Sequence, residues 1–480
     1  MKSLNQKIGI GVFWNLVNLF MSRGASTIFM LFLARFLAPE AFGLIAMASI
    51  AFELANALVN SGLGTALIRS KEVTKTDLST VFYSNIAISL LCYCLLFFAA
   101  PLISSFYSQP ELTALLRVMG LVVFINAANI VQVVVLSRKM DFRSQMKANT
   151  FGAILSGLIA SIAAWQGMGV WSLVLQILSA AFLTTLLFWV QSDWRPALLF
   201  SFESFGRLFR FGKNLLAEGV LEIIFQNSYV LVIGRFFSAE VTGLYFLAKK
   251  INGFVSQNLT VAVQQATFPA LSTLQDDNVV LKANYRKIMQ VMIFTISPVM
   301  ALLGGLAPSI FEVAFSSSWY GAVPYLQLLC VAGVIYPLHA LNINLLNVKG
   351  RSDLILKVGI LKKLVSVGFL VVSIPYGVTG VVASQVASSI FALLPNTYYS
   401  SSLIGYSLIE QVRDVIKPLS AAAVAGIAVS FVGSELARYQ FFGLLAALAA
   451  GLVIYLAACF LVKAEGGGVL WVKVRRMIKV

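Results

Sequence analysis

The stretch "ARFLAPEAFGL" at residues 34–44 places an arginine and a glutamate between two long apolar segments. The chain repeats this stretch 200 residues later as "GRFFSAEVTGL" at 234–244, with the arginine, the glutamate and the Gly-Leu pair at the same spacing. A junction that recurs at a fixed offset indicates an internal repeat. The sequence therefore predicts two similar halves, each beginning with two apolar segments joined by this turn.

The composition is that of a membrane protein. Hydrophobic residues make up 59% of the chain and charged residues only 11%, too little polar surface for a soluble protein of 480 residues. Apolar stretches follow one another along the chain, each long enough to cross a hydrocarbon core of ~30 Å. They lack the period-two alternation of membrane β-barrels, and helices satisfy their own backbone hydrogen bonds in lipid. We predict an all-α polytopic membrane protein.

Fourteen transmembrane helices are expected. Their approximate ranges are 9–34, 42–66, 80–101, 112–136, 148–165, 168–190, 212–234, 242–267, 288–310, 321–347, 355–374, 378–399, 416–434 and 441–462.

The positive charge orients these helices. The net charge is +16, and most Lys and Arg residues fall in the inner loops and tails if the N-terminus is cytoplasmic. The outer loops then hold only Arg35, Arg235 and Arg438. This asymmetry follows the positive-inside rule, so both termini are expected in the cytoplasm. It also accounts for the net charge without a nucleic-acid partner.

The two copies of the repeated turn share one orientation. Six predicted helices separate them, and an even number returns the chain to the same membrane side, which is typical of a parallel repeat. A weaker similarity between residues 119–138 and 332–351 supports the repeat. We predict six-helix bundles at 1–200 and 201–400. Residues 401–480 then carry the last two helices and a basic tail that lies on the inner membrane surface as an amphipathic anchor.

Charged side chains inside the spans point to a functional cavity. Each costs about 2.5–3.5 kcal/mol at the centre of a membrane helix and usually faces a cavity or a partner. They gather in the first, second, seventh and eighth helices, which flank the two repeated turns: Arg23, Glu53, Glu218, Glu222, Lys249 and Lys250.

Polar residues in the same helices fall on single helical faces. In the second helix Ser49, Glu53, Asn56 and Asn60 share a face, and Lys249, Asn252, Ser256 and Thr260 do so in the eighth. Positions 49, 56 and 60 correspond to 249, 256 and 260 at the repeat offset. Glu218, Glu222 and Gln226 give the seventh helix its polar face. We predict that these faces line a hydrated cavity between the bundles.

A structural role remains the alternative for several of these charges. An arginine or lysine paired with a glutamate can simply hold two helices together. Arg23 lies beside the polar face of the first helix rather than on it. Glu218, near the inner end of its helix, can reach solvent. Lys362 and Lys363 in the eleventh helix fit both interpretations equally.

Two further features favour structural roles. His339 is expected to be a packing residue rather than a proton relay. Asp276 and Asp277 lie in a charged inner linker, where solvated side chains are more common than a metal or catalytic pair.

Several function classes are excluded. The chain has no Gly-Lys-Ser/Thr phosphate loop and no polar stretch long enough for a nucleotide-binding domain. Its external loops are short and poor in acidic residues and histidine, unlike those expected of a membrane glycosyltransferase or polymerase. We therefore expect a secondary transporter, not an enzyme, with no catalytic residues, bound metal or cofactor.

Several motifs of the chain resemble those of a known family. The two halves, the repeated turn, "FPALSTLQDD" at 268–277, "NYRKIMQ" at 284–290 and "PYLQLLCVAG" at 324–333 are similar to the polysaccharide transporter branch of the MOP superfamily. This branch includes Wzx-type lipid-linked oligosaccharide flippases and exopolysaccharide exporters of the colanic-acid type. The resemblance covers essentially the whole chain and implies a MATE-like fold.

The resemblance implies a substrate and a location. The substrate would be undecaprenyl-pyrophosphate-linked oligosaccharide, flipped by alternating access from the cytoplasmic to the outer leaflet of the bacterial inner membrane for surface polysaccharide assembly. Membrane lipids, a polysaccharide polymerase and a chain-length regulator would be partners.

The predicted cavity residues can be matched to this substrate. Arg23, Lys249 and Lys250 could bind the pyrophosphate through charge-assisted hydrogen bonds. Glu53, Glu218 and Glu222 are candidates for ion coupling. The sugar hydroxyls would meet the side chains of Asn56, Asn60, Asn252, Ser256 and Gln226.

Two other functions remain open. A drug or cation antiporter of the same superfamily would share the fold. A non-transporting scaffold of a polysaccharide-assembling complex would not require matched polar faces in both halves.

Overall fold

The computed structural model describes residues 4–60 and 62–464, in which every regular element is a helix, as predicted. The chain divides into two compact units, Met1–Phe246 and Leu247–Val480. The boundary lies inside one long helix, α11, that spans Ala239–Ser272. The predicted division at residues 200 and 400 follows the sequence repeat, not compactness, and it stays a prediction.

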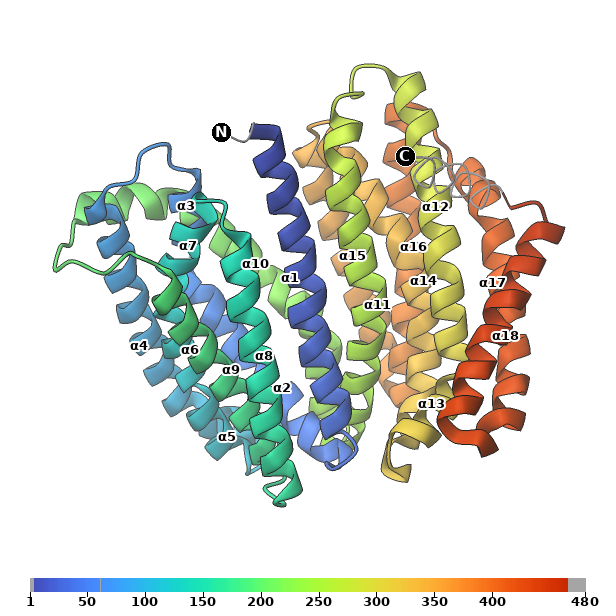
Figure 1. Ribbon diagram of the computed structural model, residues 1–480, viewed down its shortest axis with the longest axis horizontal. Helices are drawn as coiled ribbons and strands as arrows, with labels where there is room; N and C mark the ends of the chain where they lie inside the picture. The colour runs from blue at the N-terminus through green and yellow to red at the C-terminus, as the bar shows by residue number, and fades with distance from the viewer. Residues whose placement is uncertain (1–3, 61, 465–480) are drawn as a thin grey trace. The chain divides into compact units, whose positions relative to one another are not determined.

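Among the described residues, ten α-helices lie wholly in the first unit, and Figure 1 labels them. They are α1 (Leu4–Leu33), α2 (Pro39–Asn60), α3 (Leu63–Arg69), α4 (Lys75–Tyr107), α5 (Leu112–Met119), α6 (Leu121–Ala127), α7 (Ile130–Arg138), α8 (Phe142–Trp165), α9 (Val170–Gln191) and α10 (Phe202–Phe236).

Most of α11 belongs to the second unit, together with the remaining helices of the described chain. These are α12 (Asn278–Gly305), α13 (Ala307–Ala314), α14 (Val323–Val348), α15 (Ser352–Ser373), α16 (Gly377–Ile404), α17 (Leu408–Leu436) and α18 (Gln440–Leu461).

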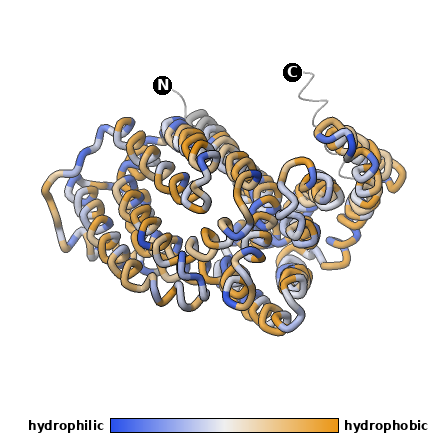
Figure 2. The backbone as a smooth tube through the Cα atoms, turned by 90° about the horizontal axis from the view of Figure 1, so that it is seen from below, coloured by the Kyte–Doolittle hydropathy of each residue, from blue (hydrophilic) through white to orange (hydrophobic). Residues whose placement is uncertain are grey.

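The helices have the length and surface of membrane spans. Within the described residues, 10 helical segments are long and apolar enough to cross a membrane. Helices α1, α11, α15 and α16 occupy the other four predicted ranges, so the count of fourteen stays a prediction. Apolar residues predominate along most helices in Figure 2. Large ones face outward, such as Phe98 at 75% exposure and Phe460 at 84%, as lipid-facing side chains do.

Helix ends follow local sequence signals. Thr74 and Asp77 form a reciprocal capping box at the start of α4. Asp277 accepts hydrogen bonds from the backbone N–H groups of Val279 and Val280 and so caps α12. Asp277 of the acidic pair at 276–277 therefore contributes a helix cap.

Close helix packing depends on small residues in the second unit. Helices α17 and α18 lie side by side (Figure 1), and α17 also packs along α12. A Cβ at Gly305 of α12 would lie only 2.3 Å from the carbonyl oxygen of Gly426 on α17. Backbones this close are typical of membrane helix pairs with small residues at their interface.

We expect Gly305→Val to lower the free energy of unfolding by about 1–3 kcal/mol, because the added side chain overpacks this interface. Thermal unfolding in detergent measures the loss. Gly368→Val on α15 is the matched control, since a Cβ there meets no atom within 4 Å among the described residues. Equal melting temperatures for the two variants would contradict the packing role.

Candidate functional site

Two transmembrane helices of the first unit are interrupted. Helix α2 ends at Asn60 and α3 begins at Leu63, with Gly62 between them in the left-handed conformation at φ 69°. A Cβ at Gly62 would lie 2.6 Å from the Cα of Gly212 on α10, so glycine is needed both for the turn and for this contact. The second interruption separates α6 from α7 at residues 128–129.

Side chains of α9 satisfy the backbone groups that the second interruption frees. The indole Nε1 of Trp189 donates to the carbonyl oxygen of Ala128 at 2.9 Å. Thr185 Oγ1 donates to the carbonyl oxygen of Ile125 at 3.3 Å and accepts from Asn129 Nδ2 at 2.7 Å. The interruption is therefore a stabilised feature of the fold.

A cavity of about 410 Å³ lies between the two interruptions. Unwound backbone at membrane depth is tolerated where protein buries it or where it lines a water-filled cavity, and discontinuous helices often mark binding sites. The lining residues are Ala57, Asn60, Gly62, Gly64, Thr65, Ile68, Asn129, Ile130, Val133, Val134, Leu216 and Gly219.

The predicted polar face of α2 leads to this cavity. Glu53 Oε2 accepts a hydrogen bond from Asn227 Nδ2 of α10 at 2.8 Å. Asn56 Oδ1 accepts from Asn126 Nδ2 of α6 at 3.3 Å. Asn60 is exposed and lines the cavity itself. The structure thus brings Glu53, Asn56 and Asn60 together along one side of the first unit.

Sequence reasoning missed the partners of this face. Asn126 lies in a helix with no charged residue near it, and Asn227 lies outside the face that was assigned to the seventh helix. Asn129 gave a signal, because it aligns with Asn342 in the weaker repeat. Tertiary packing was needed to place all three amides beside α2 or at the cavity.

The other predicted residues of the first unit lie on exposed surfaces. Gln226 Nε2 donates to Glu222 Oε1 at 2.8 Å, one turn away on α10. Both side chains are exposed, as are Glu218 on the same helix and Arg23 on α1. Their roles in binding or coupling stay predictions.

The predicted face of α11 in the second unit is packed inward. Asn252 Nδ2 donates to the carbonyl oxygen of Leu329 on α14 at 2.5 Å. Ser256 is 2% exposed and donates to the Asn252 carbonyl oxygen at 2.9 Å. Lys249 is half-buried and Lys250 is exposed. Lys250 lies outside this face, and the substrate-binding roles of all four residues stay predictions.

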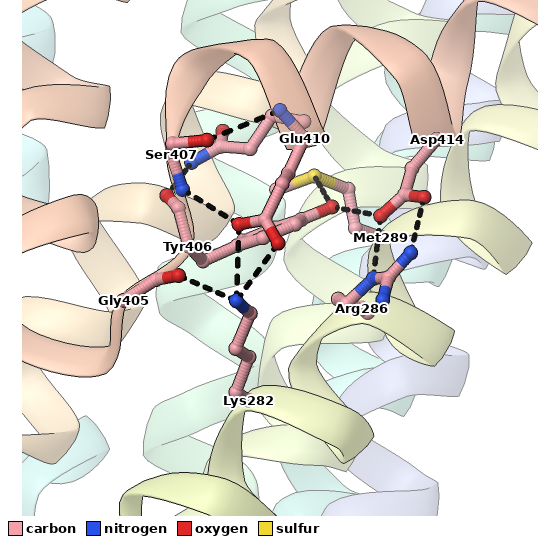
Figure 3. Close-up of polar contacts among 9 residues, drawn as sticks. Lys282, Arg286, Met289, Gly405, Tyr406, Ser407, Glu410 and Asp414 are labelled. Carbon is pink, nitrogen blue, oxygen red and sulfur yellow. Dashed lines mark hydrogen bonds and ion pairs between the residues drawn. The ribbon is translucent and has the colours of Figure 1, made fainter.

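A charged cluster joins α12 to the start of α17 (Figure 3). Arg286 donates to both carboxylate oxygens of Asp414, at 2.7 and 2.6 Å, and the Asp414 side chain is 6% exposed. Tyr406 Oη also donates to Asp414, at 2.7 Å. Lys282 donates to Glu410 at 3.0 Å. Sequence analysis did not assign these pairs, because their members are about 128 residues apart.

Buried hydrogen bonds extend this cluster into the second unit. Gln411 Nε2 donates to the carbonyl oxygen of Tyr406 at 3.1 Å and accepts from Asn342 Nδ2 at 3.2 Å. Tyr285 Oη and Ser400 Oγ both donate to Asn342 Oδ1. This network links α12, α14, α16 and α17.

His339 occupies a neighbouring polar contact. Its ring nitrogens hydrogen-bond Ser389 at 3.1 Å and Asn396 at 2.8 Å. Both partners belong to α16, so the imidazole joins α14 to α16, in agreement with the packing interpretation.

We expect Arg286→Met to lower the free energy of unfolding by about 1–3 kcal/mol, because it leaves the buried Asp414 carboxylate without its charged partner. A thermal-unfolding cycle with Asp414→Leu and the double variant measures the coupling. The double variant should lose less than the sum of the single losses. Lys287→Met, an exposed cation on the same helix, is the control, and additive losses would contradict the pairing.

Comparison with known proteins places these features in a family. A family model described as "Polysaccharide biosynthesis protein" matches residues 32–324, more than half of the chain. The Escherichia coli (strain K12) lipopolysaccharide biosynthesis protein WzxC is 25% identical over 77% of this chain and 76% of its own length. The Rhizobium meliloti (strain 1021) succinoglycan biosynthesis transport protein ExoT is 27% identical over 70% of this chain and 67% of its own length.

A third relative is matched over a shorter part. The Bacillus subtilis (strain 168) teichuronic acid biosynthesis protein TuaB is 26% identical, and the match spans 62% of each chain.

Solved structures share the fold. The lipid II flippase MurJ in its inward closed conformation superposes with a TM-score of 0.74 at 14% identity, over 93% of this chain and 98% of its own. An inward-facing multidrug resistance MATE transporter of the MOP superfamily gives a TM-score of 0.64 at 17% identity. The match covers 82% of this chain and 94% of the transporter. The MATE-like helical fold expected from the sequence is confirmed.

Proposed function

The chain belongs to the polysaccharide biosynthesis protein family, and from this premise we propose that it flips polyprenyl-pyrophosphate-linked oligosaccharide across a membrane. Two relatives are named for the biosynthesis of lipopolysaccharide and of succinoglycan, and the second is named a transport protein. The observation that carries the proposal is the flippase-like helical fold over nearly the whole chain, with a cavity at two interrupted helices whose mostly apolar lining includes the amides of Asn60 and Asn129.

The polar groups of the two units suit different parts of this substrate. Pyrophosphate is bound by cations in a weakly hydrated site, which Lys249 and Lys250 of α11 and Arg23 of α1 can supply. Sugar hydroxyls both donate and accept hydrogen bonds. Side-chain amides do the same, so the α2 face and the cavity at Asn60 and Asn129 fit the oligosaccharide. Gln226, Asn252 and Ser256 complete the proposed set.

Carboxylates of the first unit are the proposed coupling groups. Glu53 is half-buried and accepts from Asn227, so a change in its protonation alters a contact between α2 and α10. Glu222 bonds Gln226 on α10, and Glu218 lies one turn before it. A proton or sodium ion taken up at these groups would link transport to an ion gradient.

The proposed location is the bacterial inner membrane, with both termini in the cytoplasm. Flipping would deliver oligosaccharide to the outer leaflet, where a polymerase and a chain-length regulator would take it up. Transport is the whole activity proposed, without catalysis by this chain.

Flipping in proteoliposomes tests the function. Fluorescent polyprenyl-pyrophosphate oligosaccharide is followed with an impermeant quencher. We expect the wild type to move the lipid and Lys249→Ala to slow it roughly tenfold or more, because a charge-assisted contact to the pyrophosphate is lost. Lys357→Ala, an exposed lysine on α15, should leave the rate unchanged.

The behaviour of the wild type decides between the candidate functions. If it moves no lipid with or without a proton or sodium gradient, while it exports an organic cation, the protein is a drug antiporter. Equal flipping rates for wild type and Lys249→Ala would show that Lys249 does not bind the substrate, while the proposed flippase function would stand.

Glu53→Gln tests coupling, because glutamine can still accept from Asn227 but cannot ionise. We expect the variant to flip at the basal rate and to lose its acceleration by an ion gradient. The measurement is the flipping rate with and without imposed proton and sodium gradients. Undiminished acceleration would exclude Glu53 as the coupling group.

A further inference from the structure

The two copies of the repeated turn meet within the first unit. Gly43 lies in α2 four residues after Pro39, and Gly243 lies in α11 four residues after Ala239. A Cβ at Gly43 would be 1.8 Å from the carbonyl oxygen of Ala239, and a Cβ at Gly243 would be 1.8 Å from the carbonyl oxygen of Pro39. Each added Cβ would also lie 3.0 Å from the backbone nitrogen of the other glycine.

This contact is reciprocal. Each glycine faces the first residue of the other helix at the same distance, so a local two-fold relation connects the two copies of the motif. The α11 copy, with Ala239 four positions before Gly243, has the spacing of small residues that brings membrane helices into backbone contact, whereas the α2 copy has Pro39 at the first position. Alanine is already too large at either glycine. The structure therefore explains why both copies keep glycine.

Buried side chains surround the contact. Phe42 is 1% exposed and Leu44 is 2% exposed on the α2 side. Thr242 and Tyr245 are both fully buried on the α11 side. The first turns of α2 and α11 are thus tightly packed together at the end of the first unit where α1 joins α2.

The contact is also suited to opening. The atoms that meet are backbone atoms, whose attraction is short-ranged, so a small separation removes it. Helix α11 starts at this contact in the first unit and continues after Phe246 as part of the second. A displacement of the first turn of α11 away from α2 would part the glycines.

We propose that Gly43 and Gly243 form a latch that holds the first turns of α2 and α11 together and parts once in each transport cycle. The consequence for transport rests on the proposed function, whereas the closure itself can be measured without transport. The two glycines are positioning residues, and no contact with the substrate is assigned to them.

Thiol labelling tests the closure. Cys92, Cys94, Cys330 and Cys459 are replaced by serine, and Ala46→Cys, a fully buried position one turn after Gly43, serves as the reporter. We expect Gly43→Leu, and separately Gly243→Leu, to raise the rate of labelling by an impermeant maleimide roughly tenfold, because the closed state loses population.

Gly368→Leu is the matched control and should leave labelling slow, since that position meets no atom within 4 Å in the described structure. Size-exclusion chromatography verifies folding, and the milder Gly43→Ala replaces any variant that does not fold. Folded variants whose reporter stays as protected as in the control would overturn the latch.

Cross-linking tests the opening. Glu40 and Glu240 are exposed and adjoin the two contact residues Pro39 and Ala239. Glu40→Cys/Glu240→Cys is joined by bis-methanethiosulfonate reagents of graded length, and flipping is measured before and after reduction. We expect the shortest linker that joins the thiols to stop flipping and reductant to restore it. Glu40→Cys alone should be unaffected by the reagent.

Cross-linked protein that flips at the unlinked rate would show that the contact stays closed throughout the cycle, and the latch would be wrong. Unlinked protein that does not flip would count against the proposed function, while the labelling result would still decide whether the contact is a closure.

Discussion

Backbone hydrogen bonding in a hydrocarbon environment is the constraint on which the rest of the structure depends. Each unpaired N–H or C=O group costs several kcal/mol there, so the chain crosses the membrane as helices. Where a helix is interrupted, protein groups or water must replace the lost bonds. The interruption after α6 meets this requirement through Trp189 and Thr185 of α9. The polar side chains of α9 that face this interruption are thus explained by the backbone groups they satisfy.

Charged groups fall into two classes under the same constraint. Arg286 and Asp414 form a two-bond pair beside Tyr406, which fixes α17 against α12. Glu53 instead has a neutral partner, Asn227. The charged pair suits a structural joint between the two helices. The coupling role proposed for Glu53 therefore concerns a carboxylate that joins α2 to α10 through an amide.

Glycine has two distinct uses in the first unit. At Gly62 it permits a left-handed turn and the approach of α10, and so keeps the α2–α3 interruption open to the cavity. At Gly43 and Gly243 the backbone is helical, and glycine is required because the two helices touch through their main chains. The first use shapes a binding surface, whereas the second brings the copies of a repeated motif together.

The sequence by itself determined the helical membrane fold, the family and the repeated turn, because hydropathy, composition and motif spacing are local properties. It also assigned Glu53, Asn56 and Asn60 to one face, since helical periodicity is fixed by geometry. Periodicity could not show that Asn126 and Asn227 hydrogen-bond to this face. Nor could it show that Ser256 is buried in the second unit or that Arg286 pairs with Asp414. Those contacts join residues far apart in the chain, and only the packing of helices decides which faces meet.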